Sequence, residues 1–192
     1  MMKNAAFWAG VDYGAKFRAS TAITFLKKKT ITTVLSPKKT DVDLWLEDFL
    51  QKEGIHVVFM DAPLSLPKIY FDPLDQESSH HFRQVDRELG AMSPLFLGGL
   101  TARAMAFKQK IEKRGATVLE TYPSAILRKR FSEKTLDEAL LLIASEVEFA
   151  FPSIDGMNPH EKDSILAWYA GYRYHKKESM IFGRKEEGQI FL

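Results

Sequence analysis

The hydrophobic positions in the first quarter of the chain follow the pattern of strands. A nearly continuous apolar run covers 7–13, as expected for a strand buried on both faces. Residues 19–26 and 30–35 are rich in Thr, Ile, Val and Phe, and the polar turn 27–29 joins them. We therefore predict an antiparallel meander of three strands.

Beyond residue 40 the pattern changes to helices that alternate with short buried strands. Apolar residues recur at helical spacing over 42–50, with Thr40 or Asp41 as the N-cap and Gly54 just past the end. Short apolar runs at 56–60 and 117–120 predict two more strands. Further helices are predicted at 80–89, 101–114, 136–149 and 160–175.

Three consecutive strands followed by alternating elements predict an α/β fold with a mixed five-stranded sheet and helices on both faces. A length of 192 residues suits one core, so we expect a single domain over 1–192. Residues of about 62–100 form a helical insertion after the fourth strand, and residues of about 179–192 form a C-terminal hairpin. The pattern leaves open whether the proline-containing loop from Ala62 to Ser79 closes over a site.

Composition restricts the available chemistry. The chain has no cysteine, which excludes a disulfide framework, a thiolate zinc site, an iron–sulfur cluster and a cysteine nucleophile. The net charge is only +2, yet nine basic and three acidic residues lie between 101 and 134. This stretch is compatible with a phosphate-backbone partner and equally with a solvated helix face. No apolar run approaches a membrane span or a signal sequence, so we expect a cytoplasmic protein without a membrane partner.

Acidic residues end all three of the buried strands. They are Asp12, Asp61 and Glu120. Ligands of an open α/β sheet bind at the carboxyl ends of parallel strands, so these acids converge if the strands are neighbours. A fourth acid, Asp163, is expected in the first turn of a helix whose small residues at 167, 170 and 171 would let it lie close to the sheet.

Four clustered carboxylates repel one another unless a cation neutralises them, and oxygen ligands suit Mg²⁺ or Mn²⁺. Two such ions about 4 Å apart can activate a water and stabilise the leaving oxygen of a phosphodiester. Three of the acids also have an ordinary interpretation, because Asp12 and Asp61 precede turns and Asp163 belongs to a helix start. Taken together, the pattern favours a catalytic two-metal site made of Asp12, Asp61, Glu120 and Asp163.

Two arginines lie four residues apart on the predicted helix 80–89. Arg83 and Arg87 can point to one side and orient a phosphate near the metals. A solvated helix with an internal pair to Asp86 explains them equally well. The histidines at 80, 81 and 160 lack spaced partners, so the catalytic set predicted here omits them.

A set of short motifs spans most of the chain, from about residue 7 to 175. The motifs are Gly10-Val11-Asp12-Tyr13-Gly14, Asp61-Ala62-Pro63-Leu64-Ser65-Leu66-Pro67, Asp86-Arg87-Glu88-Leu89, Glu120-Thr121-Tyr122-Pro123 and His160-Glu161-Lys162-Asp163-Ser164. They resemble domain-of-unknown-function family 429, a group of predicted nucleases with a ribonuclease H-like fold. The first-strand motif is common in the wider superfamily, whereas Asp-Ala-Pro and Glu-x-Tyr-Pro are more specific.

The resemblance implies a ribonuclease H-like core and a metal-dependent nuclease or phosphodiesterase. Asp12 would match the first-strand aspartate, Asp61 the acid that ends the fourth strand, and Asp163 the acid on the final helix. Glu120 would match the acid that the Holliday-junction-resolvase branch uses at the fifth strand. The implied cofactor is Mg²⁺ or Mn²⁺, and the implied substrate is nucleic acid, DNA or RNA.

Two other functions remain open at the level of the sequence. One is a non-catalytic nucleic-acid-binding module, and the other is an ATP-using member of the ribonuclease H-like superfamily. The chain has no Walker motif, no Gly-x-Ser-x-Gly elbow and no His-Glu-x-x-His motif. The sequence does not distinguish DNA, RNA, a branched junction or a small nucleotide as substrate, and it does not indicate an oligomeric state.

Overall fold

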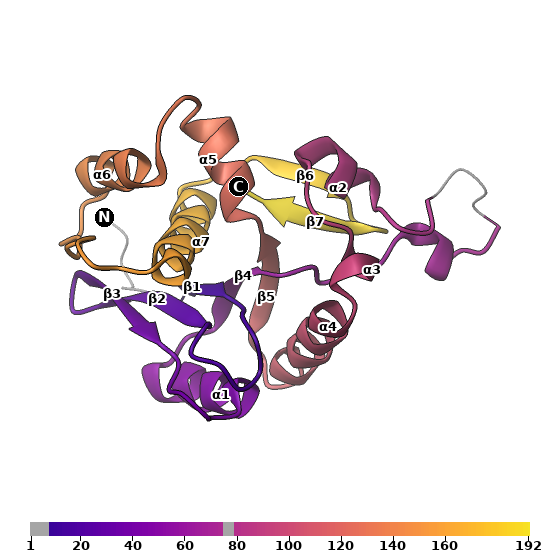
Figure 1. Ribbon diagram of the computed structural model, residues 1–192, viewed down its shortest axis with the longest axis horizontal. Helices are drawn as coiled ribbons and strands as arrows, with labels where there is room; N and C mark the ends of the chain where they lie inside the picture. Colours follow the sequence, from indigo (N-terminus) through magenta and orange to yellow (C-terminus); the bar gives the residue numbers. More distant parts are fainter. Residues whose placement is uncertain (1–7, 75–78) are drawn as a thin grey trace.

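The computed structural model describes residues 8–74 and 79–192 and shows an α/β fold built on a mixed sheet (Figure 1). Phe7, where the first predicted strand starts, and residues 75–78 of the predicted loop lie outside these ranges. The strands are β1 Trp8–Asp12, β2 Ala22–Lys27, β3 Thr30–Leu35, β4 Val57–Asp61, β5 Thr117–Thr121, β6 Ile181–Arg184 and β7 Gly188–Phe191. The helices are α1 Val42–Glu53, α2 Gln84–Leu89, α3 Pro94–Leu97, α4 Gly99–Glu112, α5 Pro123–Arg130, α6 Leu136–Glu146 and α7 Pro159–His175, with one 3₁₀ turn, η1 Lys68–Tyr70.

The sheet has seven strands in the order β3-β2-β1-β4-β5-β7-β6. The predicted antiparallel meander forms β1, β2 and β3, and β4 and β5 run parallel to β1. The prediction of five strands is wrong, because the C-terminal hairpin joins the sheet. Strand β7 runs parallel to β5 with Ile190 opposite Glu120, and the hydroxyl of Thr121 donates to the carbonyl of Phe191 at 2.7 Å. The hairpin thereby covers the edge of β5 that would otherwise be unpaired.

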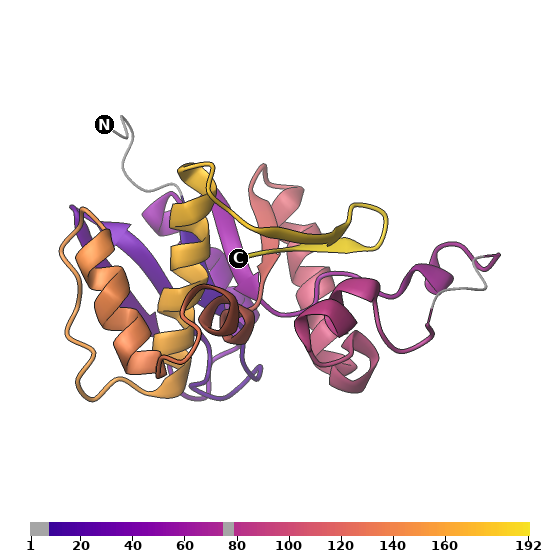
Figure 2. The same ribbon diagram turned by 90° about the horizontal axis from the view of Figure 1, so that it is seen from above.

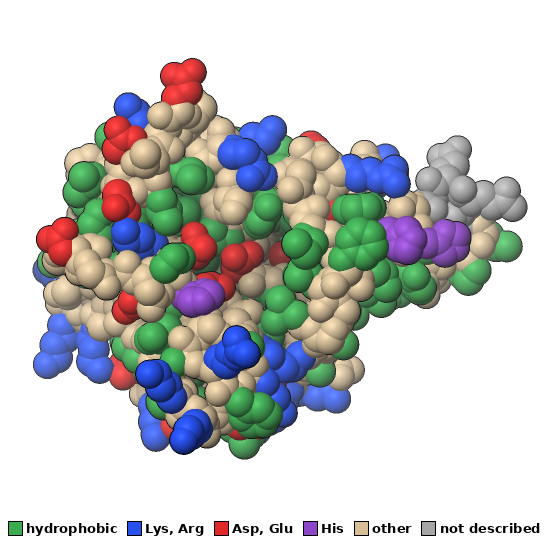
Figure 3. Space-filling view, viewed as in Figure 1, with side chains coloured by type: hydrophobic (Ala, Val, Ile, Leu, Met, Phe, Trp, Pro, Cys, Tyr) green, Lys and Arg blue, Asp and Glu red, His purple; other side chains and the backbone are tan. Residues whose placement is uncertain are grey.

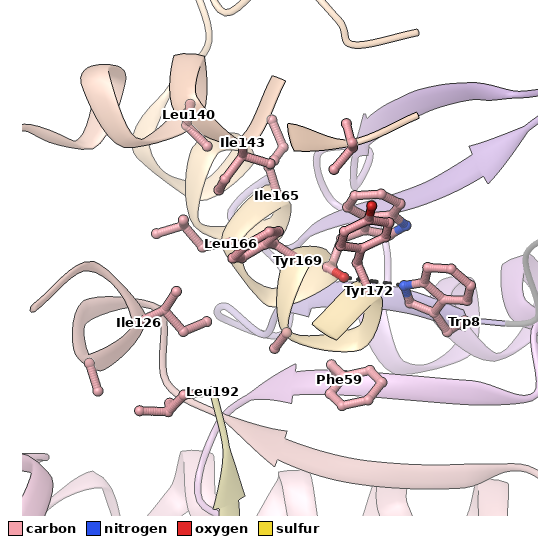
Figure 4. Packing of buried hydrophobic residues seen from close by; sticks show 14 of the residues in the cluster. Trp8, Phe59, Ile126, Leu140, Ile143, Ile165, Leu166, Tyr169, Tyr172 and Leu192 are labelled. Carbon is pink, nitrogen blue, oxygen red and sulfur yellow. Dashed lines mark hydrogen bonds between the residues drawn. The ribbon is translucent and has the colours of Figure 1, made fainter. Parts of the chain in front are cut away.

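Helices cover both faces of the sheet, as predicted (Figure 2). On one face α7 lies between the sheet and α6, and Leu140 and Ile143 of α6 pack against it (Figure 4). Apolar side chains of α1 and α4, among them Leu46 and Phe107, fill the core on the other face. Figures 1 and 2 also show the insertion after β4 and the β6–β7 hairpin projecting to the same side.

Helix α7 approaches β1 at van der Waals distance. A Cβ atom on Gly10 would lie 1.9 Å from the backbone nitrogen of Trp168, and one on Gly171 would lie 2.3 Å from the ring of Trp8. The indole of Trp8 donates to the carbonyl of Trp168 at 3.2 Å. The small residues predicted to let this helix lie close to the sheet, 167, 170 and 171, are all buried against it.

Several element boundaries differ from the predicted ones. Helix α2 begins only at Gln84, because the carboxylate of Asp86 accepts from the backbone N–H of Arg83 and closes the first turn there. The short helices α3 and α5 were not predicted, although each starts with a proline at a position that favours helix initiation. Within the described residues, no helix is both long enough and apolar enough to cross a membrane.

Candidate active site

Two of the predicted site residues lie side by side at the carboxyl edge of the sheet. In the parallel register of β1 and β4, Asp12 is opposite Asp61, and Asp61 is opposite Thr121 of β5. Residues opposite one another in parallel strands point to the same face of the sheet. Side chains an even number of positions away along the same strand share a face. Phe59, two positions before Asp61, belongs to the core beneath α7. Both aspartates therefore point toward α7.

The start of α7 brings two further side chains to the same place. The side chain of Asn158 caps the helix by accepting from the N–H of Glu161, and Pro159 follows the cap. One residue later, Nδ1 of His160 lies 2.7 Å from Oδ2 of Asp12. Asp163 is three residues further on, so it shares a helix face with His160. It stands in the second turn rather than the predicted first turn, because α7 begins at Pro159.

Hydroxyl groups hold this end of α7 on the sheet. The hydroxyl of Ser164 is buried and donates to the carbonyl of Glu161 at 2.7 Å. It therefore accepts from Thr24 of β2 at 2.7 Å, and Thr24 accepts in turn from Thr33 of β3 at 2.8 Å. The relay fixes α7 next to Asp163 across two strands of the meander.

All three aspartates have raised pKa values, and burial is the largest cause in each case. Burial raises the pKa of Asp12 from 3.8 to about 6; the hydrogen bond and charge of His160 lower it, and the charge of Asp163 raises it. Burial also raises the pKa of Asp61 well above its ordinary value, and the charges of Asp12, Asp163 and Glu120 add to that effect. Burial raises the pKa of Asp163. Within the described ranges, no lysine or arginine forms an ion pair with any of the three. Among the described residues, the cluster therefore has no lysine or arginine to neutralise it, and His160 offsets part of its charge when protonated.

Glu120 does not join this cluster, contrary to the prediction. It is opposite Met60 rather than Asp61, so its side chain points to the other face of the sheet. There it accepts from both terminal nitrogens of Arg83, at 2.6 and 2.7 Å, and from the N–H of Leu64 at 2.9 Å. Burial raises the pKa of Glu120, and the hydrogen bonds from Arg83 oppose that rise. The carboxylate is thus satisfied by a buried arginine.

The arginine pair does not form the predicted phosphate clamp. Arg83 has only 1% of its side chain exposed and is held by Asp86 and Glu120 together. These partners raise the pKa of Arg83 against the effect of burial. Arg87 is exposed, and its guanidinium lies over the ring of Phe82 at 5.8 Å from the ring centroid. Arg83 therefore holds the structure together, and the two arginines do not share a surface.

Sequence analysis missed three side chains around Asp12. His160 was set aside, although its spacing of three from Asp163 was a usable signal. Tyr13 donates to Oδ1 of Asp43 at 2.5 Å, and Nε of Arg103 donates to the Tyr13 hydroxyl at 2.9 Å. Arg103 also donates to the carbonyl of Gly14. These bonds anchor the chain immediately after Asp12, and because they join residues about 30 and 90 positions apart, no local pattern indicates them.

The basic stretch 101–134 does not form one surface. It comprises α4 and α5, which lie on opposite faces of the sheet. Lys110 and Arg114 of this stretch pair with Glu47 of α1. Arg128 and Arg130 donate to backbone carbonyls. Many of its basic side chains therefore already have partners within the protein.

The surface around the acidic site carries both signs of charge. In Figure 3 acidic side chains gather beside a histidine in a hollow near the middle of the face. Lys and Arg side chains lie along the lower edge, where Figure 1 places α1 and the loop after β1. A basic rim therefore borders the acidic cluster on the side of α1.

The residues of the cluster suit a hard divalent cation in their chemistry. Carboxylate oxygens are the donors that Mg²⁺ and Mn²⁺ prefer, and burial raises the pKa of all three carboxyl groups, so keeping them ionised without a metal is costly. Across 8–74 and 79–192, no three His, Asp or Glu side chains are assembled closely enough to hold one ion as they stand. Fold and cluster together define an α/β protein with an acidic site at the carboxyl edge of a mixed sheet.

Comparisons with known proteins add one finding. No protein-family model matches the chain, and no curated protein matches it. Among solved structures, the chain is similar to RuvC from Thermus thermophilus, with a TM-score of 0.46 and 13% identity, over 89% of this chain and 96% of that chain. A likeness at this level carries no argument about function, which rests on the geometry of the site.

Proposed function

We propose that this protein is a metal-dependent nuclease that hydrolyses phosphodiester bonds in nucleic acid. The observation that carries the proposal is the group of Asp12, Asp61 and Asp163, three carboxylates gathered on one face of the sheet whose pKa values are raised and which have no lysine or arginine partner among the described residues. Such a group is costly to keep unless it binds a cation.

In this proposal Asp12, Asp61 and Asp163 hold Mg²⁺ or Mn²⁺. The bound metal would neutralise charge and lower the pKa of a water that attacks the phosphorus. Glu120 is left out of the ligand set, because Arg83 and the N–H of Leu64 already occupy its oxygens. Its hydrogen bond to Leu64 instead fixes the chain three residues after Asp61.

His160 positions Asp12 and keeps a proton close to the site. When Asp12 is ionised, Nδ1 of His160 donates the hydrogen bond of 2.7 Å, which leaves Nε2 as the free basic nitrogen. The side chain of His160 is 45% exposed, so Nε2 can exchange a proton with solvent or with a leaving group. This arrangement also orients the Asp12 carboxylate.

The proposed assignment to a ribonuclease H-like fold, and to family 429 within it, is supported by element order. An antiparallel meander leads into two parallel strands, and a final helix carries the last acid to the ends of β1 and β4. Asp12 and Asp61 end β1 and β4, and Asp163 lies on α7, which is compatible with the proposed assignment.

Cleavage assays test the proposal. Wild-type protein is mixed with labelled single-stranded, double-stranded and branched DNA and RNA in Mn²⁺, Mg²⁺ or chelator. We expect metal-dependent cleavage of at least one substrate, reduced at least about 100-fold in Asp61→Asn, since groups that only orient metal ligands are already worth about 10–100-fold. Asp48→Asn, an exposed acid on α1, serves as the matched control and should cleave normally. Binding without cleavage by the wild-type protein would favour a non-catalytic binding module instead.

A further inference from the structure

An exposed aromatic ring stands in the loop between β1 and β2, a few residues after Asp12. The ring of Phe17 is 62% exposed, and the residues on either side of it, Lys16 and Arg18, are also exposed. A single exposed phenylalanine is ordinary on a protein surface, so the case for Phe17 rests on what surrounds it.

The loop that carries Phe17 is held in a defined shape. The backbone N–H of Gly14 donates to the Thr21 hydroxyl at 2.9 Å, and that of Ala15 donates to the Ser20 hydroxyl at 2.9 Å. The carbonyl of Lys16 accepts from the N–H of Val42 at 3.0 Å. Hydrogen bonds thus connect the two ends of the loop to each other and the loop to the start of α1. They fix the conformation in which Phe17 is exposed.

This loop leaves the sheet at the same edge as the acidic cluster. Asp12 is opposite Ala22 in the antiparallel register, and Ala22 is opposite Leu35 at the end of β3. The loop 13–21 and the segment 36–41 therefore both start in the row of residues that contains Asp12 and Asp61. Both segments thus begin at the strand ends that carry the carboxylates.

The surface made by these two segments is basic. Residues 13–21 and 36–41 contain four basic residues, Lys16, Arg18, Lys38 and Lys39, and one acid, Asp41. Lys16 pairs with Asp41 at 3.2 Å, and its ammonium lies 5.5 Å from the centroid of the Phe17 ring. In the portion of the chain that the structure describes, the other three cations have no ion-pair partner. Figure 3 shows basic side chains gathered at this edge.

We propose that Phe17 is a stacking platform for an unpaired base, and that Arg18, Lys38 and Lys39 contact the adjoining phosphates. A basic groove combined with an exposed aromatic ring is the chemistry that binds single strands, because every base offers a face to stack on while a duplex keeps its bases covered. The inference rests on the proposed function and makes it more specific, since it assigns single-stranded DNA or RNA, or an unpaired segment, to the acidic site.

Binding measured without cleavage tests this surface. Fluorescence anisotropy of labelled single-stranded DNA and RNA oligonucleotides, and of the matching duplexes, is recorded in chelator with the full chain. We expect tighter binding of a single strand than of its duplex. Phe17→Ala should weaken single-strand binding about 5- to 150-fold, the range for loss of one stacked base, and should leave duplex binding within about twofold.

Two further variants serve as controls. Phe96→Ala removes another exposed phenylalanine, 65% exposed on α3, and should leave both affinities unchanged. Phe17→Trp keeps a ring and should retain single-strand binding, which guards against a merely disturbed loop. Lys38→Ala should weaken binding of both forms and reduce the salt slope by about one.

The outcomes separate this inference from the proposed function. Equal affinities of Phe17→Ala and wild type for single strands, an equal loss on duplex, or no single-strand binding by the wild type would each overturn the stacking surface. Binding that depends on Phe17 without any metal-dependent cleavage would overturn the hydrolysis and leave the surface standing. Metal-dependent cleavage with no effect of Phe17→Ala on binding would overturn the stacking surface and leave the hydrolysis standing.

Discussion

Two opposing effects set the pKa of the Asp12 carboxyl group, and this pKa decides how the site is charged without a metal. Only 13% of the Asp12 side chain is exposed, and burial favours the neutral acid, whereas the contact with His160 favours the anion. Burial prevails, so the pKa stands at about 6, above the ordinary value of 3.8. A carboxyl group that gives up its charge this readily in the folded state is poised to gain from a cation.

The raised pKa of Asp12 predicts a pH-dependent cost to stability. The folded state holds the proton more tightly than the unfolded state, so the contribution to stability is complete below pH 3.8 and is lost as the pH rises to about 6. In chelator, Asp12→Asn should therefore match the wild-type protein near pH 4 and be up to about 3 kcal/mol more stable at pH 7.5, at about 1.4 kcal/mol per pKa unit.

Urea unfolding of both proteins at pH 4 and pH 7.5 checks this prediction. Asp48→Asn, at a site that is 57% exposed, provides the control and should change stability by less than about 0.5 kcal/mol at either pH. A stability difference between Asp12→Asn and wild type that does not vary with pH would contradict the account of the cluster.

At the scale of elements, the site depends on how closely α7 lies on β1. Gly10 permits that approach, because its backbone contacts the backbone of α7 directly. Gly10→Ala would force a methyl group into the space of the Trp168 nitrogen, where neither backbone can yield locally. We expect a loss of about 3 kcal/mol or more in the free energy of unfolding, at or above the usual range for overpacking.

Thermal or urea unfolding measures the effect of Gly10→Ala. Gly99 is the matched control, because a Cβ atom there meets nothing within 4 Å and Gly99 opens α4 with ordinary backbone angles. Gly99→Ala should leave stability unchanged or slightly raised. Similar stabilities for the two variants would show that α7 is free to move away from the sheet.

The insertion is joined to the sheet through a buried ionic network. Arg83 connects Asp86 of α2 to Glu120 of β5, and its Nη1 donates to the Ser65 hydroxyl at 2.8 Å. In the β6–β7 turn, the carboxylate of Glu187 accepts from the backbone N–H groups of Lys68 and Gln84, at 3.0 and 2.9 Å. The network thus ties the insertion to both β5 and the hairpin.

Arg83→Met should cost about 3–5 kcal/mol, because it leaves Glu120 and Asp86 buried without their cation. Arg87→Met on the same helix should change stability by less than about 1 kcal/mol, since Arg87 is exposed. The two variants are compared by urea unfolding at neutral pH. A small effect of Arg83→Met would mean that water or another residue replaces the guanidinium, contrary to the role assigned here.

For the whole molecule, much of the fold follows from local pattern, and the site follows only in part. Strand β3 has the predicted bounds, and the meander, the parallel strands and the helix-covered faces are all confirmed. Periodicity reveals elements but not how their edges pair, so the hairpin's place beside β5 was missed. Of the strand-end acids, Asp12 and Asp61 lie side by side at the carboxyl edge of the sheet.

The fate of Glu120 shows why a strand-end motif alone does not define a site. A shift of one residue in register turns a side chain to the opposite face of the sheet. Glu120 is opposite Met60, one position before Asp61, so it points away from the face that Asp12 and Asp61 share. His160 was missed for a different reason, because a hydrogen bond across 148 positions depends on the packing of α7 against β1. The spacing of three from Asp163 places His160 on the same helix face, but it does not reveal the contact with Asp12.

The distribution of charge over the molecule also differs from what the sequence suggested. The basic stretch 101–134 is divided between two faces, while the segments 13–21 and 36–41, which begin at the edge that carries Asp12, contain Lys16, Arg18, Lys38 and Lys39, none of which was singled out from the sequence. A net charge of +2 conceals an acidic cluster and a basic rim next to each other. That arrangement is compatible with the nucleic-acid substrate proposed above.

Titration of Mn²⁺ into the protein by calorimetry at pH 7.5 tests the central claim most directly, because it asks whether the acidic cluster binds a divalent cation. The proposal predicts saturable binding by the wild-type protein, lost or weakened at least about 100-fold in Asp61→Asn and retained in Asp48→Asn. Absence of binding in the wild-type protein, or equal binding in Asp61→Asn, would contradict it.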